Sequence, residues 1–338
     1  AAEGSSSDTP VAPTDPASSS PFDRYYAPGF TSVYKPKRGG AVSFGGLLDR
    51  VARVDPEMRI RFTSPHPKDF TDDVLQTIAR HSNICSHLHM PAQSGSSAVL
   101  HSMRRGYTRE AYDSLIARVR EVIPEVSLST DIIAGFCGES EADHAATLDL
   151  MRFTGYDQAF MFAYSRRDKT HAAKHLQDDV PEAVKQRRLA EVIAAFREGL
   201  TARNAAEVGR RHIVLVEGTS KRGPEFLTGR TCSFKRAVFP AVPLGEYLVG
   251  EGAEAERKAE PAGVGGREPA AGDYVAVQVV SATAGTLTCV PLGLTTIGSF
   301  VSHHGGTTPR QIYQEVGLCE EPQPPYSCIG QSEEHATA

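Results

Sequence analysis

The stretch SLSTDIIAGFCGES, residues 127–140, decides the fold that we predict for this chain. Its first half is typical of a strand, because two serines and Asp131 occupy alternate positions and therefore share one face. Gly135 and Gly138 then permit a tight turn, and Ser140 followed by an acidic residue three positions later indicates a helix start. A strand, a glycine turn and a capped helix form half of a βαβ unit, whose ligands lie beyond the carboxyl end of the strand.

Extended and helical segments alternate on both sides of this stretch. We expect strands over residues 59–64, 86–93 and 158–165, and helices over residues 44–54, 71–81, 99–103, 108–123 and 140–153. Such alternation indicates parallel βαβ units, and four strands are too few to close an eight-stranded barrel. The sequence therefore predicts an α/β fold with an incomplete barrel.

Each expected strand has one polar or mixed face, represented by Arg61, His89, Ser129 and Tyr164. The opposite faces are apolar enough to meet the helices. We therefore expect the polar faces to line a shared lumen that holds water or a polar ligand, since polar groups are costly to bury without partners. The alternative is an open sheet whose polar faces point to solvent.

Composition divides the chain into five segments. We expect disorder over residues 1–40, a partial barrel over 41–180, a connecting helix over 181–208, a small antiparallel β-barrel over 209–292 and a mostly disordered tail over 293–338. Residues 241–271 are rich in Gly, Ala, Glu and Pro, and predict a flexible insert within the β-barrel.

The first part of the predicted β-barrel is basic. Residues 209–240 contain seven Lys or Arg and only two Glu, in a chain whose net charge is −5, and Phe226 and Phe234 lie among them. Basic loops with aromatic side chains on a small barrel favour binding of single-stranded RNA. The alternative is an ordinary solvated surface. The candidate RNA-binding residues are Lys221, Arg222, Arg230 and Lys235.

Length and composition narrow the classes of protein that this chain can represent. Its 338 residues suggest about two domains, and its net charge gives no whole-chain argument for nucleic acid binding. Six cysteines without a CxxC pair exclude a disulfide framework or a zinc module and favour a reducing compartment. No apolar run approaches the ~20 residues that span a bilayer, and no signal peptide is visible, so we expect no membrane partner.

Two further patterns concern metals and completeness. Cys85, His87 and His89 alternate on one expected strand, but neighbours along one strand rarely surround an ion, so we predict no metal site. The chain begins at Ala1 rather than Met, from which we expect a fragment or a processed product.

Three motifs at strand ends could bind a ligand. The glycine turn in residues 131–140 could hold a nucleoside or phosphate through backbone N–H groups, or be a plain loop. HMPAQSGSS, residues 89–97, is dense in hydrogen-bonding groups, although Ser96 or Ser97 could simply cap a helix. MRRGY (103–107) and YSRR (164–167) offer guanidiniums suited to carboxylate or phosphate, or are solvated ends.

Several motifs together resemble the radical S-adenosylmethionine (SAM) methylthiotransferases. They are TSPHP (63–67), HMPAQSGSSAVLHSMRRGYTRE (89–110), STDIIAGFCGES (129–140) and FAYSRRDKT (162–170). The QSGS form at residues 93–96 is most similar to the tRNA-modifying branches, and the resemblance is strongest to the animal mitochondrial branch that acts on isopentenyl-adenosine beside the anticodon. VLVEGTSKR (214–222) and LTGRT (227–231) resemble the TRAM domain, a β-barrel that grips the anticodon stem-loop.

The resemblance implies a radical-SAM (βα)6-type partial barrel followed by TRAM, and 2-methylthiolation of tRNA in mitochondria by a monomer. It implies S-adenosylmethionine and two 4Fe–4S clusters as cofactors. By position it implies contacts to S-adenosylmethionine or its charged groups from Gln93, Ser94, Ser96, Arg105, Asp131, Ile133, Gly135 and Arg166.

The chain also departs from the family's pattern. The CxxxCxxC loop that holds the radical cluster and three further cysteines of the sulfur-donating domain are absent, while Cys137 and Lys169 replace a frequent Pro and Gly. We therefore expect the first two barrel strands and the N-terminal domain to be missing and this polypeptide alone to bind no iron. It would be a fragment of an active enzyme or a non-catalytic RNA-binding isoform. The remaining alternative is an unrelated βα-barrel enzyme with a phosphate-containing ligand.

Overall fold

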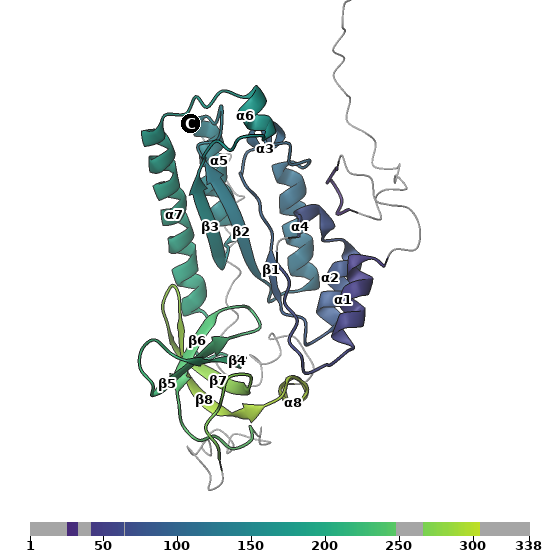
Figure 1. Ribbon diagram of the computed structural model, residues 1–338, viewed down its shortest axis with the longest axis vertical. Coiled ribbons are helices and arrows are strands. Elements are labelled where there is room, and N and C mark those ends of the chain that lie inside the picture. The colour runs from purple at the N-terminus through teal and green to yellow at the C-terminus, as the bar shows by residue number, and fades with distance from the viewer. Residues whose placement is uncertain (1–25, 33–41, 64, 248–265, 305–338) are drawn as a thin grey trace, which may run out of the picture.

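The computed structural model describes residues 26–32, 42–63, 65–247 and 266–304 (Figure 1). The described chain forms two units, a parallel sheet covered by helices and a small closed β-barrel. Helix α7 (Glu182–Ala205) runs along the sheet and ends beside the barrel, so it joins the two units as the predicted connecting helix.

The sheet unit contains three parallel strands in the order β1-β2-β3. These strands are β1 (His87–His89), β2 (Ser127–Ala134) and β3 (Gln158–Ala163). The helices are α1 (Phe44–Ala52), α2 (Asp72–Arg80), α3 (Ser97–Ser102), α4 (Arg109–Val122), α5 (Glu141–Thr154) and α6 (His171–His175), with a 3₁₀ turn at Pro67–Asp69. The alternation of strands and helices confirms the predicted α/β fold.

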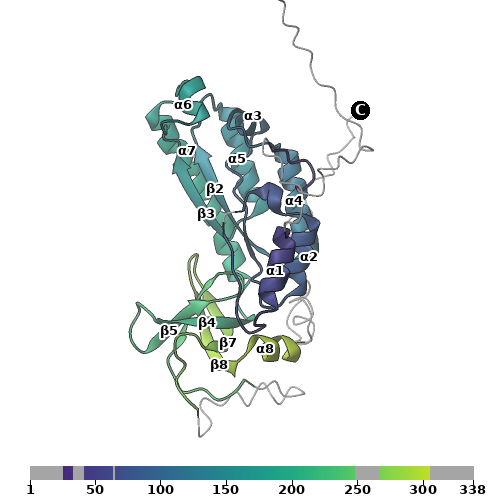
Figure 2. The same cartoon turned by 45° about the vertical axis from the view of Figure 1, so that its right-hand side comes forward.

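Helices cover one face of the sheet (Figure 2). Apolar side chains of the strands and helices form the core between them. Leu88, Leu128 and Ile132 are fully buried and belong to one cluster with Ile116 of α4 and Leu150 of α5. Burying a side chain of this size contributes about 1.5–3 kcal/mol relative to leaving it in water. The apolar strand faces therefore meet the helices, as the alternation in the sequence predicts.

The opposite face of the sheet is polar. The His89 ring nitrogen Nδ1 lies 2.9 Å from Ser129 Oγ, and His89 Nε2 lies 3.5 Å from an Asp131 carboxylate oxygen. Tyr164 follows β3 and lines a pocket at the end of the same sheet. Arg61 does not join these residues, because its guanidinium stacks at 4.2 Å on the Phe234 ring of the β-barrel. His89 and Ser129 therefore share one face of the sheet, and Tyr164 alone of the four lines the pocket at its end, so a shared lumen stays a prediction for these three residues and is wrong for Arg61.

Of the predicted strands, one is absent from the described residues and another is shorter than expected. Residues 59–64 form no strand where they are described; Ile60 alone makes a parallel bridge, to Ile84. The strand predicted over 86–93 ends at His89, since Pro91 lacks the N–H that a continuous ladder needs. Pairing with β2 resumes at Gln93, which forms a parallel bridge to Ile132.

The second unit is a closed barrel in the order β4-β5-β6-β8-β7. Its strands are β4 (Arg211–Thr219), β5 (Phe226–Arg230), β6 (Arg236–Pro240), β7 (Tyr274–Ala282) and β8 (Leu287–Thr295), and α8 (Ile297–His303) follows them. The small β-barrel is as predicted, but it is mixed rather than antiparallel, because β6 and β8 are parallel. Strand β5 and helices α6 and α8 were not predicted as elements.

The predicted boundaries of disorder are wrong in three places. Ala27 and Phe30 are buried in the core of the sheet unit, although they lie within the segment 1–40. The described ends of the insert are ordered by a bridge between Leu244 and Arg267, while its middle lies outside the described residues. In the tail, β8 continues to Thr295 and α8 follows, whereas residues 305–338 lie outside the described part.

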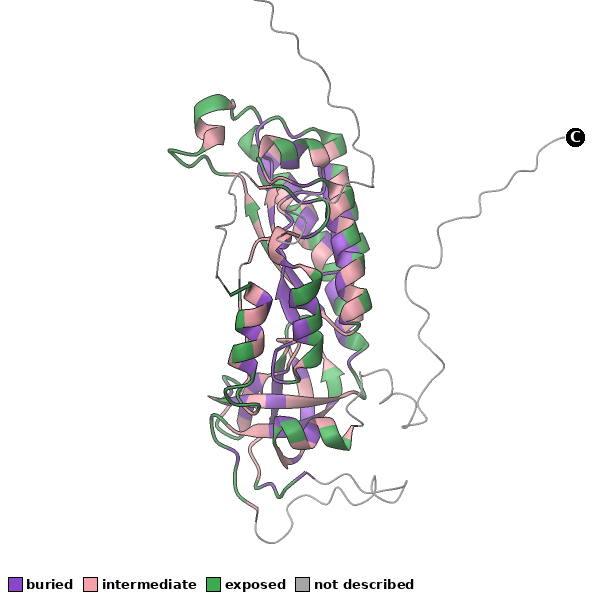
Figure 3. Cartoon of the chain, turned by 90° about the vertical axis from the view of Figure 1, so that its right-hand side faces the viewer, coloured by how far each residue is buried: buried purple, intermediate pink, exposed green. Residues whose placement is uncertain are grey.

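The two units share an extended interface. Buried positions continue from the sheet unit into the barrel in Figure 3. The Lys235 ammonium of the barrel lies 3.2 Å from Asp157 of the sheet unit and 3.1 Å from Glu207 after α7. Among the described helices, none has the length and apolarity that crossing a bilayer requires.

Candidate functional site

A pocket of about 560 Å³ opens at the carboxyl ends of the three parallel strands. Its walls come from β2, from the segments that follow β1 and β3, and from α6. The lining residues include Gln93, Met103, Arg105, Asp131, Ile133, Phe136, Phe162, Tyr164, Arg167 and His171. This is the edge at which open parallel sheets bind their ligands, because the loops that follow the strands meet there.

Strand pairing fixes the polar floor of this pocket. The Gln93 N–H donates to Asp131 O at 2.8 Å, and the Ile133 N–H donates to Gln93 O at 2.9 Å. Gln93 has φ of +69°, a left-handed conformation that non-glycine residues adopt rarely. The two backbone hydrogen bonds hold Gln93 in that conformation.

Four of the eight predicted cofactor-contacting residues line this pocket, namely Gln93, Arg105, Asp131 and Ile133. They come from the segment after β1, from the end of α3 and from β2. The pocket therefore brings together an amide, a guanidinium, a carboxylate and an apolar wall. Their contact with a cofactor stays a prediction.

The other four predicted residues lie outside the pocket lining. Ser94 is buried with its hydroxyl 3.3 Å from that of Thr147, and Ser96 caps α3 and donates to Asp143 at 2.5 Å. Arg166 is exposed and donates to the carbonyl of Ala173. For Ser96 the helix cap, which was the alternative interpretation, is what the structure shows.

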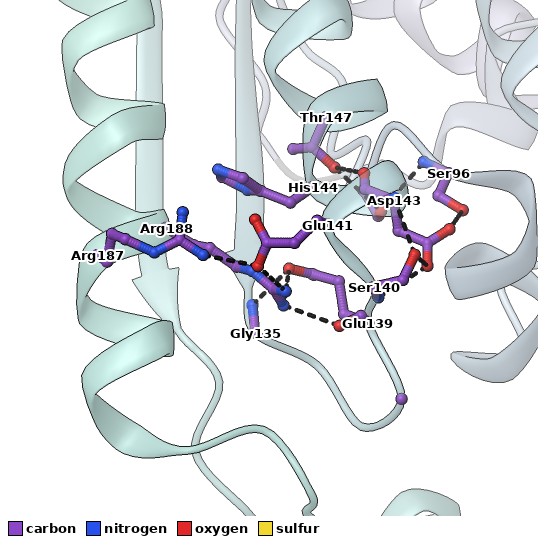
Figure 4. A network of polar contacts seen from close by, with 12 residues as sticks. Ser96, Gly135, Glu139, Ser140, Glu141, Asp143, His144, Thr147, Arg187 and Arg188 are labelled. Carbon is purple, nitrogen blue, oxygen red and sulfur yellow. Dashed lines mark hydrogen bonds and ion pairs between the residues drawn. The ribbon is translucent and has the colours of Figure 1, made fainter.

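Gly135 belongs to a network that holds the turn after β2 (Figure 4). Its N–H donates to Glu139 Oε1 at 3.1 Å, and the buried Arg188 of α7 donates to the same oxygen at 3.0 Å. Burial raises the pKa of Glu139. Arg188 also donates to Glu141 at 2.7 Å, so one guanidinium of α7 ties down both the turn and the first residue of α5.

The start of α5 is held by a second part of this network. Ser140 and Asp143 form a reciprocal capping box (Figure 4). Burial alone would raise the pKa of Asp143, but hydrogen bonds from Ser140 and Ser96 outweigh that effect and lower it. Through Ser96 the cap reaches the segment after β1, so the segment that carries Gln93 is fixed to the start of α5.

The sequence analysis missed part of the pocket wall. Phe136 packs edge-on against Tyr164 with 4.8 Å between ring centroids, and both line the pocket. His171 of the unpredicted helix α6 also lines it, and its buried Nδ1 has no hydrogen-bond partner among the described residues. Arg167, rather than the predicted Arg166, contributes the guanidinium. Nothing in a five-residue helical segment signals its position over a strand end.

The described residues do not fit an iron–sulfur cluster. No three His, Cys, Asp or Glu side chains among them are grouped so that they could hold a metal ion. The histidines of the predicted β1 strand are engaged elsewhere, since His89 contacts Ser129 and His87 stacks near Phe234 with 5.0 Å between centroids. We therefore derive no chemical step through a cluster from the part of the chain described.

The predicted RNA-binding residues lie in three different settings. Lys221 and Arg222 are exposed in the turn between β4 and β5. Arg230 lies with its guanidinium 4.3 Å from the Phe234 ring centroid. Lys235 is about 10% exposed and is engaged by two carboxylates at the interface between the units, so it does not present a free charge to RNA.

Part of the sheet unit is similar to radical SAM domains. The family described as "Radical SAM superfamily" matches residues 41–151. A solved structure of the radical SAM enzyme coproporphyrinogen III oxidase (HemN) from Escherichia coli is weakly similar, with 18% sequence identity and a TM-score of 0.39. The alignment covers 54% of this chain and 50% of the HemN chain.

The relatives identify a narrower group, the tRNA methylthiotransferases, to which this chain is homologous. It is 52% identical over 259 residues to "Mitochondrial tRNA methylthiotransferase CDK5RAP1" of Rattus norvegicus, which is 77% of this chain and 42% of that protein. It is 49% identical over 215 residues to "tRNA-2-methylthio-N(6)-dimethylallyladenosine synthase" of Phocaeicola vulgatus, 64% of this chain and 46% of that protein. The chain thus spans less than half of the length of the curated relatives that it matches.

Proposed function

We propose that this chain is part of a tRNA methylthiotransferase that adds a methylthio group to isopentenyl-adenosine beside the anticodon. The proposal is supported by one combination of features. The chain has a pocket at the strand ends and a basic β-barrel, and it is homologous to proteins that are named for this reaction. Identity of this level over most of the chain also removes the alternative of an unrelated βα-barrel enzyme.

In this proposal the pocket binds S-adenosylmethionine. Asp131 would accept hydrogen bonds from ribose hydroxyls, Arg105 would pair with the carboxylate, and Ile133 and Phe136 would contact the adenine. Gln93 would donate or accept at the same ligand. S-adenosylmethionine held in this pocket beside a reduced cluster would supply radical chemistry, and the residues that would hold such a cluster are not among the described residues.

The β-barrel would grip the anticodon stem-loop. Its Lys221 and Arg222 are exposed on the turn between β4 and β5. Phosphate contacts from such residues position RNA without reading its sequence. Arg230 and Phe234 would contribute a stacked guanidinium–aromatic surface nearby.

The test is complementation of cells that lack the corresponding methylthiotransferase. We would express the complete gene product that contains this chain, and separately the 338-residue chain, and quantify 2-methylthio-isopentenyl-adenosine in purified tRNA by mass spectrometry. The complete product should restore the modified nucleoside, and an Asp131→Asn version of it should restore much less.

The outcome for the 338-residue chain separates the two remaining candidates. Restoration by this chain alone would contradict the expectation that it is inactive without further segments. Retained tRNA binding without restoration by either product would favour a non-catalytic RNA-binding isoform. Absence of both restoration and tRNA binding in the complete product would overturn the proposed function.

We further propose a mitochondrial location and a monomeric state. Support for the location is that several relatives are named as mitochondrial, although bacterial relatives are also similar. Fractionation of cells that express the tagged complete product tests the location. Light scattering during size-exclusion chromatography tests the monomer, and a mass of twice the chain would contradict it.

A further inference from the structure

Two cysteines from different units of the fold lie together at the interface. Cys85 directly precedes β1 and is 1% exposed, whereas Cys232 lies in the β5–β6 turn of the barrel and is half-buried. Each sulfur is the largest influence on the pKa of the other, and the rings of His87 and Phe234, each two residues further along, stack with 5.0 Å between their centroids. Both thiols are free in the structure.

Arginines hold the backbones of these two segments together. The Cys85 N–H donates to Ile60 O at 2.9 Å, which fixes it beside the segment that carries Arg59 and Arg61. Arg59 donates to Arg230 O at 2.9 Å, and Arg61 donates to Thr231 O at 3.3 Å. The residue that follows Thr231 is Cys232, so the turn is clamped at the position where the thiols meet.

The two arginines lack a carboxylate partner. Within the described residues, neither guanidinium has an Asp or Glu oxygen within the 4.0 Å of an ion pair, and Arg61 Nη1 is buried without a hydrogen bond. Burial also lowers the pKa of Arg61. A partly buried cation is costly unless an anion or several hydrogen bonds compensate it. The groups that oppose this effect of burial on the pKa of Arg61 are the sulfurs of Cys85 and Cys232.

The surroundings shift the pKa values of the two thiols in opposite directions. The hydrogen bond from Cys85, together with the charge of Arg59, lowers the pKa of Cys232. The same hydrogen bond, together with burial, raises the pKa of Cys85. Cys232 is therefore the sulfur that loses its proton more readily, and Cys85 is the thiol that stays beside it. Thiolate character and exposure are what make a cysteine reactive.

We propose that Cys85 and Cys232 form a peroxide-sensitive pair that closes to a disulfide and thereby links the β-barrel covalently to the sheet unit. Hydrogen peroxide is the oxidant. The Cys232 thiolate attacks one peroxide oxygen, the O–O bond breaks, and Cys232 becomes a sulfenic acid while hydroxide leaves. The Cys85 sulfur, as its proton is lost, then attacks the Cys232 sulfur, the S–O bond breaks, and the proton and hydroxyl leave as water.

The balance of this reaction is two thiols oxidised to one disulfide and one peroxide reduced to two waters. The oxidised pair carries no charge, so Arg59 and Arg61 lose their anion. The barrel turn that carries Cys232 becomes fixed to the segment before β1. Oxidation should therefore restrict movement of the RNA-binding barrel relative to the strand-end pocket. The chemistry of the thiols does not depend on the proposed function.

The experiment uses the full chain with Cys319→Ser and Cys328→Ser, which removes the two cysteines outside the described residues. The protein is treated with hydrogen peroxide, blocked with N-ethylmaleimide, digested without reduction and analysed by mass spectrometry. We expect a peptide pair linked through Cys85 and Cys232 that disappears on treatment with dithiothreitol. Cys289→Ser, which removes another buried cysteine, should leave this product unchanged.

Two variants separate the roles of the sulfurs. In Cys85→Ser a dimedone adduct should accumulate on Cys232, because no resolving thiol remains. In Cys232→Ser, Cys85 should stay reduced at the same peroxide concentration. In Arg59→Gln, alkylation of Cys232 at neutral pH should slow by about tenfold, as a loss of thiolate predicts. Circular dichroism of each variant shows whether it folds, and a variant that does not fold is replaced by the Ala version.

Several results would overturn the proposal. One is oxidation of Cys232 in the parent protein to a sulfinic or sulfonic acid without a linked peptide. Another is oxidation of Cys85 before Cys232. Full protection of both sulfurs at peroxide concentrations that oxidise a free thiol would have the same consequence.

Discussion

Charged residues near the strand-end pocket should differ sharply in how much their removal lowers the free energy of unfolding. Arg188 is 4% exposed and donates to Glu139, which is itself buried, and to Glu141. Removing one partner of a buried ion pair leaves an uncompensated charge and costs about 3–5 kcal/mol. Arg187, the neighbouring residue on α7, contacts Glu141 and Glu191 from an exposed position.

We therefore expect Arg188→Ala to lower the free energy of unfolding by about 3–5 kcal/mol, measured by urea denaturation. Arg187→Ala is the matched control, because an exposed ion pair contributes at most about 1 kcal/mol. Equal losses for the two variants would show that burial does not decide the strength of this network (Figure 4).

Asp131 is the pocket residue whose role can be tested without a cluster. Asp131→Asn removes the charge but keeps the shape, so if the carboxylate accepts ribose hydroxyls the affinity for S-adenosylmethionine should fall about tenfold, the cost of one charge-assisted hydrogen bond. Equilibrium dialysis with labelled S-adenosylmethionine measures this. Arg166→Ala should bind like the parent protein, because Arg166 does not line the pocket. An unchanged affinity in Asp131→Asn would remove Asp131 from the site.

Glu207 at the interface predicts a dependence of stability on pH. Burial would raise the pKa of Glu207, but the hydrogen bond from His212 and the charges of Lys235 and Arg210 outweigh it and lower the pKa to about 2. A carboxylate whose pKa is lower in the folded state stabilises the fold above its unfolded pKa, near 4.5. This contribution is lost as the pH falls from about 4.5 towards 2.

The difference in unfolding free energy between the parent protein and Glu207→Gln should therefore shrink between pH 6 and pH 3, by about 2 kcal/mol. Urea denaturation at both pH values measures it. A difference that stays constant across this range would contradict the lowered pKa in the folded protein.

At the scale of elements, the turn between β2 and α5 shows how a glycine can be required for two separate reasons. Gly135 and Gly138 have φ of +76° and +73°, so both occupy the left-handed region. A Cβ on Gly135 would lie 2.4 Å from Lys185 Cγ, whereas a Cβ on Gly138 would have nothing within 4 Å. Gly135 is thus required both by its backbone conformation and by the close packing of α7. Gly138 is required by its backbone conformation alone.

We expect Gly138→Ala to cost about 1–2 kcal/mol of unfolding free energy, the cost of a left-handed conformation for an L-residue. Gly135→Ala should cost clearly more, because α7 must also shift. Urea denaturation of both variants checks the order, and a larger loss for Gly138→Ala would contradict the packing argument.

The errors in the predicted elements have identifiable physical causes. The 86–93 strand is interrupted at Pro91, although Gln93 returns to pair with β2. The alternation of residues 59–64 is typical of a strand. In the structure, however, the guanidiniums of Arg59 and Arg61 donate hydrogen bonds to backbone carbonyls of the barrel. Alternation predicts which side chains share a face and does not predict which element that face meets.

At the scale of the whole molecule, the interface between the two units decides which basic residues can meet RNA. Lys235 contacts Asp157 and Glu207 across the interface and is nearly buried, so it contributes to docking of the barrel. Lys221 and Arg222 are exposed on the barrel alone. The same basic segment, residues 209–240, therefore supplies both a structural cation and candidate phosphate contacts.

We expect the double variant Lys221→Ala with Arg222→Ala to weaken binding of an anticodon stem-loop RNA and to lower the dependence of affinity on salt, since two phosphate contacts are lost. Fluorescence anisotropy at several salt concentrations measures both. An exposed control pair on the sheet unit, Arg53→Ala with Arg80→Ala, should leave binding unchanged. Equal affinity of the barrel variant and the parent would remove this turn from the RNA surface.

The sequence by itself determined the order of strands and helices, the small barrel, the long connecting helix and the capping box at Ser140. These follow from local periodicity, glycine conformation and side-chain caps, which act over a few residues. It also placed Gln93 and Asp131 at neighbouring strand ends, because parallel strands bring their carboxyl ends to one edge.

Only the tertiary structure decided which of the candidate side chains face the pocket and which serve packing. The Ser96 hydroxyl and the Lys235 ammonium could each bind a polar ligand. In the structure Ser96 instead donates to Asp143, and Lys235 is paired with two carboxylates at the interface. The meeting of Cys85 with Cys232 likewise depends on how the barrel docks, and contacts between units distant in sequence leave no periodic trace in either segment.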